Sequence, residues 1–242
     1  MSYRNYINLD GSELDSPVFR IMPIERLLQV LESRQLVLVR PRKWDDPFEN
    51  ALLSATLRTD DGITGSFSAK DSVYGQCWTS DRETDAMWRI YSPDKQGIKV
   101  KTSPRKLLQA LQAATTEFWE LRCFIGRVQY QDESDLLDTL QNMDWRASNG
   151  SGIAESLLYK RKEFTHEHEI RLIYSGPDNA SNSDIHAFNV TPNELIEELV
   201  LDPRMDVELG KAFQLAIENK QFTNPISQSS LYRAPKGLVI SI

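Results

Sequence analysis

The residues best suited to chemistry lie in one short stretch that carries two carboxylates and a guanidinium at alternate positions. Glu167, Glu169 and Arg171 are each separated by one residue, and side chains alternate between the two faces of a β-strand. A strand over residues 167–174 would therefore place these three side chains on one face, opposite a mostly apolar face. Neighbouring carboxylates make each other more costly to ionise, and such pairs often mark functional sites.

Two interpretations of this charged face remain open. In the first, Glu167, Glu169 and Arg171 form a salt-bridge ladder on a solvated strand face, which contributes little energy. In the second, they form the polar floor of a pocket together with Lys160. One carboxylate would then bind a sugar hydroxyl or stabilise an oxocarbenium-like cation, and the other would orient or deprotonate a nucleophile.

A second candidate is the loop Trp44-Asp45-Asp46-Pro47-Phe48-Glu49. Asp46 before Pro47 is typical of a turn, because proline restricts the preceding residue to extended geometry. The turn alone does not explain why Asp46 and Glu49 lie beside two aromatic residues. As a ligand loop, it would offer carboxylates for ribose hydroxyls or a cation and an aromatic ring for stacking on a base.

A third candidate is the junction between a strand ending in Cys77-Trp78-Thr79 and a helix over 83–91. Hydroxyl groups of Thr79 and Ser80, together with amides at the helix start, could hold a phosphate. We interpret Cys77 as a packing residue, because the sequence offers it no nearby partner for nucleophilic chemistry.

The helix that follows carries Trp88, Arg89 and Tyr91, which could form a stacking surface and a charge clamp. The alternative is structural: aromatic residues at helical spacing are core residues more often than ligand contacts. In that case Trp88 and Tyr91 are buried, and Arg89 is solvated.

Composition limits the classes of function. The net charge of −7 and the pI of about 5.1 argue against a broadly basic nucleic-acid-binding surface. Two cysteines and three histidines, without metal-type spacing, predict neither a disulfide framework nor a metal site. The sequence also lacks an apolar run typical of a signal peptide or a membrane span. We therefore expect a cytoplasmic protein without a membrane partner or a bound metal.

The elements that must position these residues alternate without a regular βαβ rhythm, which favours an α+β fold with a mixed, largely antiparallel sheet. We expect a flexible N-terminal arm over residues 1–16 and a single domain over 17–242. The expected strands lie at 19–21, 36–39, 74–79, 97–101, 123–130, 167–174, 186–190, 199–201, 228–233 and 237–242. The expected helices follow Pro23, cover 83–91, follow Pro104, lie near 133–142 and 152–162, follow Pro192, and cover 206–220.

Taken together, these motifs resemble a bacterial and phage family that is known as a domain of unknown function. The resemblance runs from about residue 18 to 232. It rests on the Asp-Asp-Pro-x-Glu loop, the Cys-Trp-Thr strand, the Met-Trp-x-x-Tyr helix ending at Tyr91, and the Phe-x-x-Glu-x-Glu-x-Arg strand ending at Arg171. Trp44-Asp45 replaces an expected Phe-Asn, and Phe164 replaces an expected Trp.

The motif order is also similar to that of ADP-ribosyltransferases, which use an Arg on the first core strand, a Ser/Thr motif and a late Glu-x-Glu. This resemblance implies an ADP-ribosyltransferase-like fold with NAD as the substrate. Arg20 would hold the NAD diphosphate or ribose, and Thr79 would shape the nicotinamide pocket. Glu169 would bind the ribose 2′-hydroxyl, and Glu167 would position the acceptor. The expected NAD contacts as a set are Arg20, Asp46, Glu49, Trp78, Thr79, Ser80, Trp88, Arg89, Tyr91, Lys160 and Arg171.

The leading hypothesis is therefore an NAD-dependent ADP-ribosyltransferase-like enzyme with Glu169, Glu167 and Arg20 as catalytic residues. It would act as a toxin or anti-phage defence effector on a protein or nucleic-acid acceptor, with an antitoxin or immunity protein as a further partner. One alternative is a metal-dependent nuclease or phosphoesterase, in which Asp46, Glu49, Glu167 and Glu169 hold a divalent cation and Lys160 contacts phosphate. Another is a non-catalytic binding domain.

Overall fold

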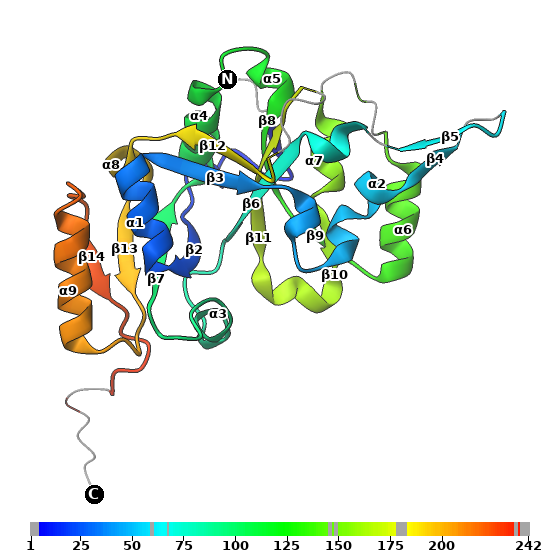
Figure 1. The fold of residues 1–242 in the computed structure, drawn as a ribbon. Helices are drawn as coiled ribbons and strands as arrows, with labels where there is room; N and C mark the ends of the chain where they lie inside the picture. The colour runs from blue at the N-terminus through cyan, green and yellow to red at the C-terminus, as the bar shows by residue number, and fades with distance from the viewer. Residues whose placement is uncertain are drawn as a thin grey trace, which may run out of the picture.

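Ten strands pair into one mixed sheet in the computed structural model, which describes residues 5–58, 61–66, 68–144, 147, 150–177, 183–234 and 237. The main strand order is β1-β8-β11-β6-β2-β7-β13-β14, and β3 pairs with both β6 and β12. The pairings β11–β6, β11–β8, β2–β7, β13–β7 and β12–β3 are antiparallel, whereas β1–β8 and β13–β14 are parallel. The expected α+β fold with a largely antiparallel mixed sheet is confirmed (Figure 1).

The elements of the chain have the following bounds. The strands are β1 Tyr6–Ile7, β2 Val18–Pro23, β3 Gln35–Val39, β4 Thr56–Arg58, β5 Thr64–Ser66, β6 Val73–Thr79, β7 Gly97–Thr102, β8 Cys123–Arg127, β9 Gln129–Gln131, β10 Tyr159–Arg161, β11 Glu169–Ser175, β12 Ile185–Asn189, β13 Glu198–Leu201 and β14 Ile226–Gln228. The α-helices are α1 Ile24–Ser33, α2 Ala51–Ser54, α3 Asp85–Tyr91, α4 Pro104–Ala114, α5 Trp119–Arg122, α6 Glu133–Asn142, α7 Ser151–Ser156, α8 Pro192–Leu195 and α9 Val207–Glu218. Short 3-10 turns occur at Pro41–Lys43, Pro47–Asn50, Ser68–Asp71 and Lys162–Glu167. Within the described residues, no helix combines the length and the apolar character that a membrane span requires.

Strand β11 lies between two hydrophobic cores. Ile170 and Leu172 face the larger core, which helices α1 and α4 help to form, while Ile173 faces a second core that includes Phe124 and Leu158. Glu169 and Arg171 share the face of Ile173 because side chains alternate along a strand. Both faces of β11 are therefore covered by protein, and its charged residues are buried.

The sheet divides beside β6. Phe19 of β2 pairs with Thr79 near one end of β6, whereas Val39 of β3 pairs with Gly75 near the other end. Within the described residues, β2 and β3 each pair with β6 through one pair of residues only. Cys77 lies midway between these two pairs. The divergence of β2 and β3 opens a gap along this edge of β6, and the candidate site occupies it.

The expected strand over 167–174 begins later than the alternating pattern predicts. Glu167 ends the 3-10 turn Lys162–Glu167, and His168 adopts a left-handed backbone conformation with φ 41°. An extended strand cannot include that conformation, so β11 begins at Glu169. The prediction that Glu167 shares the strand face of Glu169 and Arg171 is therefore wrong, although the turn returns Glu167 to the same site.

The expected helix near 152–162 is also corrected. Helix α7 ends at Ser156, and residues Tyr159–Arg161 form β10, which pairs in parallel with β9. The helical pattern in the sequence did not reveal this strand because its partner is another short strand about 30 residues away. The change matters because Lys160 lies on this short strand, from which its ammonium contacts Glu169 of β11.

Near the ends of the chain, the structure differs from the expected elements in two places. The strand expected at 228–233 lies at Ile226–Gln228, and a turn follows in which the Arg233 amide donates to the Ser230 carbonyl. The strand expected at 237–242 lies outside the described residues apart from position 237. Part of the expected N-terminal arm is packed, since Tyr6–Ile7 pairs with β8 and Leu14 is fully buried.

Candidate functional site

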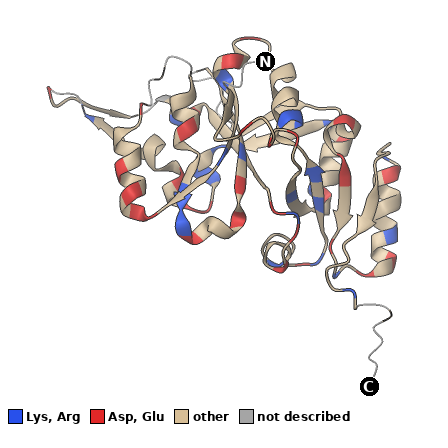
Figure 2. Cartoon of the chain, turned by 180° about the vertical axis from the view of Figure 1, so that it is seen from behind, with Lys and Arg blue, Asp and Glu red and all other residues tan. Residues whose placement is uncertain are grey.

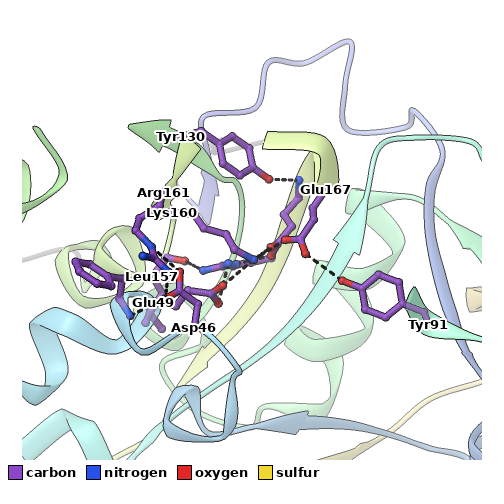
Figure 3. A network of polar contacts seen from close by, with 11 residues as sticks. Asp46, Glu49, Tyr91, Tyr130, Leu157, Lys160, Arg161 and Glu167 are labelled. Atoms are coloured by element: carbon purple, nitrogen blue, oxygen red, sulfur yellow. Dashed lines mark hydrogen bonds and ion pairs between the residues drawn. The ribbon is translucent and has the colours of Figure 1, made fainter. Parts of the chain in front are cut away.

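The ammonium group of Lys160 is the centre of the candidate site and contacts three carboxylates (Figure 3). Its Nζ lies 2.7 Å from Glu49 and 2.6 Å from Glu169, and it also donates to Glu167. The side chains of Lys160, Glu49 and Glu169 are only 6%, 5% and 7% exposed. Because buried ions require partners, this is a buried ionic network. The interpretation as a solvated salt-bridge ladder is wrong.

Arg171 is fully buried and pairs with two of these carboxylates. Its Nε lies 2.8 Å from Glu169, its Nη2 lies 3.0 Å from Glu49, and its Nη1 donates to the Leu157 carbonyl at 2.7 Å. The guanidinium stacks 4.6 Å from the centre of the Trp44 ring. Arg171 thus joins the 44–49 loop to β11 and orients two carboxylates without lining the cleft itself.

Except for Glu49, the charged residues of the network come from one short part of the chain, residues 160–171. Figure 2 shows basic and acidic residues following one another along β10, the turn after it and the start of β11. Three carboxylates and two cations, from Lys160 and Arg171, leave one net negative charge if all five groups are ionised. That charge favours a cationic group beside these carboxylates.

The two neighbouring carboxyls have pKa values that are displaced in opposite directions. Burial alone would raise the pKa of Glu169, yet Arg171 and Lys160 outweigh it and hold that pKa well below its ordinary range. Burial and the adjacent Glu169 raise the pKa of Glu167 despite the opposing effect of Lys160. Environments that separate two carboxyl pKa values in this way are typical of acid–base sites with distinct roles.

Two tyrosines contact Glu167 and Glu169, one at a carboxyl and one at a backbone amide (Figure 3). The Tyr91 hydroxyl, at the end of α3, donates to Glu167 Oε1 at 3.2 Å. The Tyr130 hydroxyl accepts from the Glu169 backbone amide at 2.9 Å. Tyr91 therefore stabilises the ionised form of Glu167, whereas Tyr130 fixes the start of β11.

Arg20 lies on β2 at the gap in the sheet. Its Nη1 is buried and has no hydrogen-bond partner among the described residues. Burial lowers the pKa of Arg20, an effect that nearby Cys77 and Tyr91 partly offset, but a guanidinium stays protonated in proteins. A buried cationic donor without a partner carries a desolvation cost, and an anionic ligand would remove that cost.

The cavity beside these residues has two lobes, of about 130 Å³ and about 600 Å³. The smaller, inner lobe lies at the gap between β2 and β6 and includes Thr79 and Met87. The larger, outer lobe extends along the 44–49 loop and the 3-10 turn and includes Asp46 and Phe164. The residues common to both lobes are Arg20, Cys77, Tyr91, Glu167 and Glu169.

The structure brings most of the sequence-predicted site residues into this cleft. Those that line one or both lobes are Arg20, Asp46, Glu49, Trp78, Thr79, Tyr91, Lys160, Glu167 and Glu169. Of these, Trp78 belongs mainly to the large core, and its indole donates to Gln76 at 2.9 Å. Asp46 accepts from the Phe48 amide at 3.1 Å and from Arg161 at 3.0 Å, so it caps its turn and pairs with a cation.

Besides Arg171, three predicted residues lie outside the residues that line the cleft. Trp88 is fully buried in a small core with Ile21 and Met87, and its indole donates to Glu83. The side chain of Arg89 is 63% exposed and pairs with Asp85 on the surface. Ser80 donates to the backbone of His168 and so fixes the turn before β11. Trp88 and Arg89 thus follow the structural alternative, in which one is core and the other is solvated.

Sequence reasoning missed several residues of the cleft. Cys77, which we interpreted as a packing residue, lines both lobes beside Arg20, and burial raises the pKa of its thiol. The Phe164 ring lies 4.5 Å from the Lys160 ammonium and lines the outer lobe. Tyr130, on β9, contacts the backbone amide of Glu169. Cys77 could have been predicted as a cleft residue, because it lies two residues before Thr79 and so shares its strand face. The contact between Tyr130 and Glu169 could not, because no local sequence pattern indicates it.

Comparison with known families supports one of the two resemblances. A family model described as protein of unknown function (DUF2971) matches residues 87–172, from α3 to β11. That range contains the Met-Trp-x-x-Tyr helix and the Glu-x-Glu-x-Arg segment, so the predicted resemblance to a domain of unknown function is confirmed. No curated protein sequence matches this chain.

Solved structures of one protein, DarT from Thermus sp. 2.9, are similar to this chain at a low level. The complex with NAD+ has a TM-score of 0.42 and 14% identity, covering 89% of this chain and 96% of DarT. The complex with ADP-ribosylated ssDNA has a TM-score of 0.40 and 15% identity, covering 88% of this chain and 93% of DarT.

Proposed function

We propose that the cleft binds NAD and that the protein is an ADP-ribosyltransferase-like enzyme. One observation supports this above all: Arg20, whose buried Nη1 has no hydrogen-bond partner among the described residues, lines the same cavity as the Glu167–Glu169 pair. NAD presents a diphosphate anion and, at the bond to nicotinamide, a carbon that becomes cationic during displacement. A cleft with a cationic group and a carboxylate pair meets both requirements.

Arg20 is assigned to the diphosphate or the adjoining ribose. Guanidinium groups bind phosphate oxygens through charge-assisted hydrogen bonds that are stronger than neutral ones. The buried Nη1 of Arg20 has a donor available for such a bond. The inner lobe, with Thr79, Met87 and Tyr91, is assigned to the nicotinamide ring because its walls are partly apolar.

Glu169 is assigned to the ribose 2′-hydroxyl and to stabilisation of the cation-like transition state. Arg171 and Lys160 hold its carboxylate ionised and fixed. A fixed charge needs no reorganisation during the reaction, which makes it effective in stabilising a transition state. The bond between the anomeric carbon and nicotinamide breaks, and the electron pair leaves with neutral nicotinamide.

Glu167 is assigned to the proton of the acceptor. The acceptor forms the new bond to the anomeric carbon, and its proton passes to the Glu167 carboxylate. The raised pKa of Glu167 makes it the better base of the two carboxyls. As the acceptor we propose a protein or nucleic acid, and as the biological role a toxin or an anti-phage defence effector that an antitoxin or immunity protein would restrain.

The metal-dependent alternative meets an obstacle in the same geometry. Its cation would have to lie among Asp46, Glu49, Glu167 and Glu169. The Lys160 ammonium already contacts three of these carboxylates, and Asp46 pairs with Arg161. Activity that a chelator abolishes and that NAD does not affect would nevertheless favour this alternative over NAD chemistry.

Arg20→Met is expected to weaken NAD binding by about 10- to 100-fold, which corresponds to the loss of one hydrogen bond between charged groups. Isothermal titration calorimetry with NAD measures the effect. Arg26→Met is the matched control, because Arg26 is an exposed residue of α1 that bonds to Gln29. Equal NAD affinity of Arg20→Met and the wild type would contradict the role of Arg20, and no binding by the wild type would contradict the proposed function.

Activity is expected to fall on the acid side at a pH above the ordinary Glu pKa of about 4.3, because Glu167 must be ionised to accept a proton and its pKa is raised. Tyr91→Phe removes a donor to the ionised carboxylate, so the acid limb should move to still higher pH. The pH profile of kcat/KM for nicotinamide release measures both effects. Tyr159→Phe, on β10 but outside the residues lining the cleft, is the control. Identical acid limbs for Tyr91→Phe and the wild type would reject Glu167 as the base.

A further inference from the structure

The end of helix α3, which carries Tyr91, is held by an ion pair outside the cleft. Arg204 donates to the carbonyl of Trp88 at 2.9 Å and to the carbonyl of Ser92 at 2.7 Å. The same guanidinium lies 2.7 Å from Asp202, whose side chain is fully buried. The Trp88 carbonyl also accepts from the Ser92 amide, and the Ser92 carbonyl from the Lys95 amide. Arg204 therefore adds a second donor to each carbonyl and connects the end of α3 to Asp202.

Ser92 completes this arrangement, which we call the α3 clasp and define as Ser92, Gly97, Asp202 and Arg204. The Ser92 hydroxyl donates to Asp202 at 2.6 Å and accepts from the Gly97 amide at 2.8 Å. A Cβ at Gly97 would lie 2.5 Å from the Ser92 Cβ, so the close approach requires glycine. The clasp therefore fastens the residue after α3 to both β7 and the end of β13.

We infer that Arg204 is a positioning residue that keeps the Tyr91 hydroxyl on Glu167. Helix α3 has seven residues, and so short a helix depends on tertiary contacts for its stability. Trp88 fixes the middle of the helix in its small core, while the clasp fixes the end that carries Tyr91. Only the importance of this contact for catalysis rests on the proposed function.

The contact is sensitive to small displacements. The Tyr91 hydroxyl lies 3.2 Å from Glu167 Oε1, slightly beyond the usual range of an O–H···O hydrogen bond. Among the described residues, the charged and titratable groups that face Glu167 are Lys160 from β10, Glu169 from β11, Tyr91 from α3 and Tyr130 from β9. Of these four elements, the clasp holds α3 alone. A change in Glu167 after substitution of Arg204 therefore reports on Tyr91.

The test is a titration of the Glu167 side-chain carboxyl by carbon-13 NMR, with the resonance assigned from a Glu167→Gln variant. We expect Tyr91→Phe to shift the titration to higher pH, because the ionised carboxylate loses a donor. Arg204→Met should produce a shift of the same sign, and the double variant should shift no further than Tyr91→Phe alone. An unchanged titration in folded Arg204→Met, or fully additive shifts, would overturn the assignment.

Two further variants keep the test decisive. Arg26→Met removes an exposed guanidinium on α1 and should leave the titration unchanged. If Arg204→Met does not fold, Ser92→Ala removes the hydroxyl between Asp202 and Gly97 and should shift the titration in the same direction. An unshifted titration in that variant also overturns the assignment. Because the titration requires neither NAD nor turnover, its outcome is independent of whether the proposed function is correct.

Discussion

Glu169→Gln is expected to lower kcat for ADP-ribosyl transfer by about 10²- to 10³-fold, the range observed when a fixed electrostatic group is removed from an active site. The substitution keeps the shape of the side chain but removes the charge that Arg171 and Lys160 hold in place. The ground state of NAD has little cationic character at the ribose carbon, whereas the transition state has much more. The effect should therefore appear in kcat more than in KM. Initial rates of nicotinamide release measure it.

The control for this prediction is Glu163→Gln, the same substitution at an exposed position of the 3-10 turn. It should leave the rate unchanged. Both variants should remain folded, because Lys160 and Arg171 keep Glu49 as a partner after Glu169 is changed. A Glu169→Gln variant with the activity of the wild type on NAD would remove Glu169 from the mechanism and with it the main role proposed for the cleft.

The face of β11 on which each side chain lies could be predicted, because it depends only on neighbouring residues. Ile170 and Leu172 face one core, and Arg171 shares the opposite face with Glu169, as a period of two requires. The same reasoning failed at Glu167, which ends the 3-10 turn before the strand. A left-handed residue, His168, separates the turn from the strand, and hydrophobic alternation contains no signal for such a conformation.

Burial of the charged face could not be predicted, because the groups that cover it are distant in sequence. Glu49 and Trp44 contact Arg171 from a loop more than 120 residues earlier. Strand β10, which supplies Lys160, pairs with another short strand and was predicted as a helix. The similarity in motif order to ADP-ribosyltransferases proposed roles for Arg20 and Glu169, but whether the two share one cleft could not be predicted; both line the cavity beside β6.

Arg171→Met is expected to lower the free energy of unfolding by about 3–5 kcal/mol, the typical cost of removing one partner from a buried ion pair. Arg171 is fully buried and contacts Glu49, Glu169 and the Leu157 carbonyl. Methionine fills part of the same volume, but it donates no hydrogen bond to these acceptors and carries no charge to balance the two carboxylates. Urea unfolding at neutral pH measures the change. Arg89→Met, which breaks an exposed pair with Asp85, should cost about 0.3–0.5 kcal/mol.

A second substitution distinguishes lost charge from lost packing. Adding Glu49→Gln to Arg171→Met removes one carboxylate that has lost a cation, so the double variant should be more stable than Arg171→Met alone. If packing beneath Trp44 were the main contribution of Arg171, the second substitution would add its own cost. A double variant less stable than Arg171→Met would therefore contradict the electrostatic explanation.

The pH dependence of this difference follows from the direction of the Glu169 shift. Arg171 and Lys160 lower the pKa of Glu169 in the folded protein. Glu169 therefore contributes stability above its unfolded pKa of about 4.3, and that contribution is lost as the pH falls through the lower folded pKa. Arg171→Met removes much of this contribution already at neutral pH, because Glu169 loses one of the cations that lower its pKa. Unfolding free energies of the wild type and the variant should accordingly converge as the pH falls from about 4.3 towards the lower folded pKa, whereas a constant difference over that range would indicate that the lost interaction is not ionic.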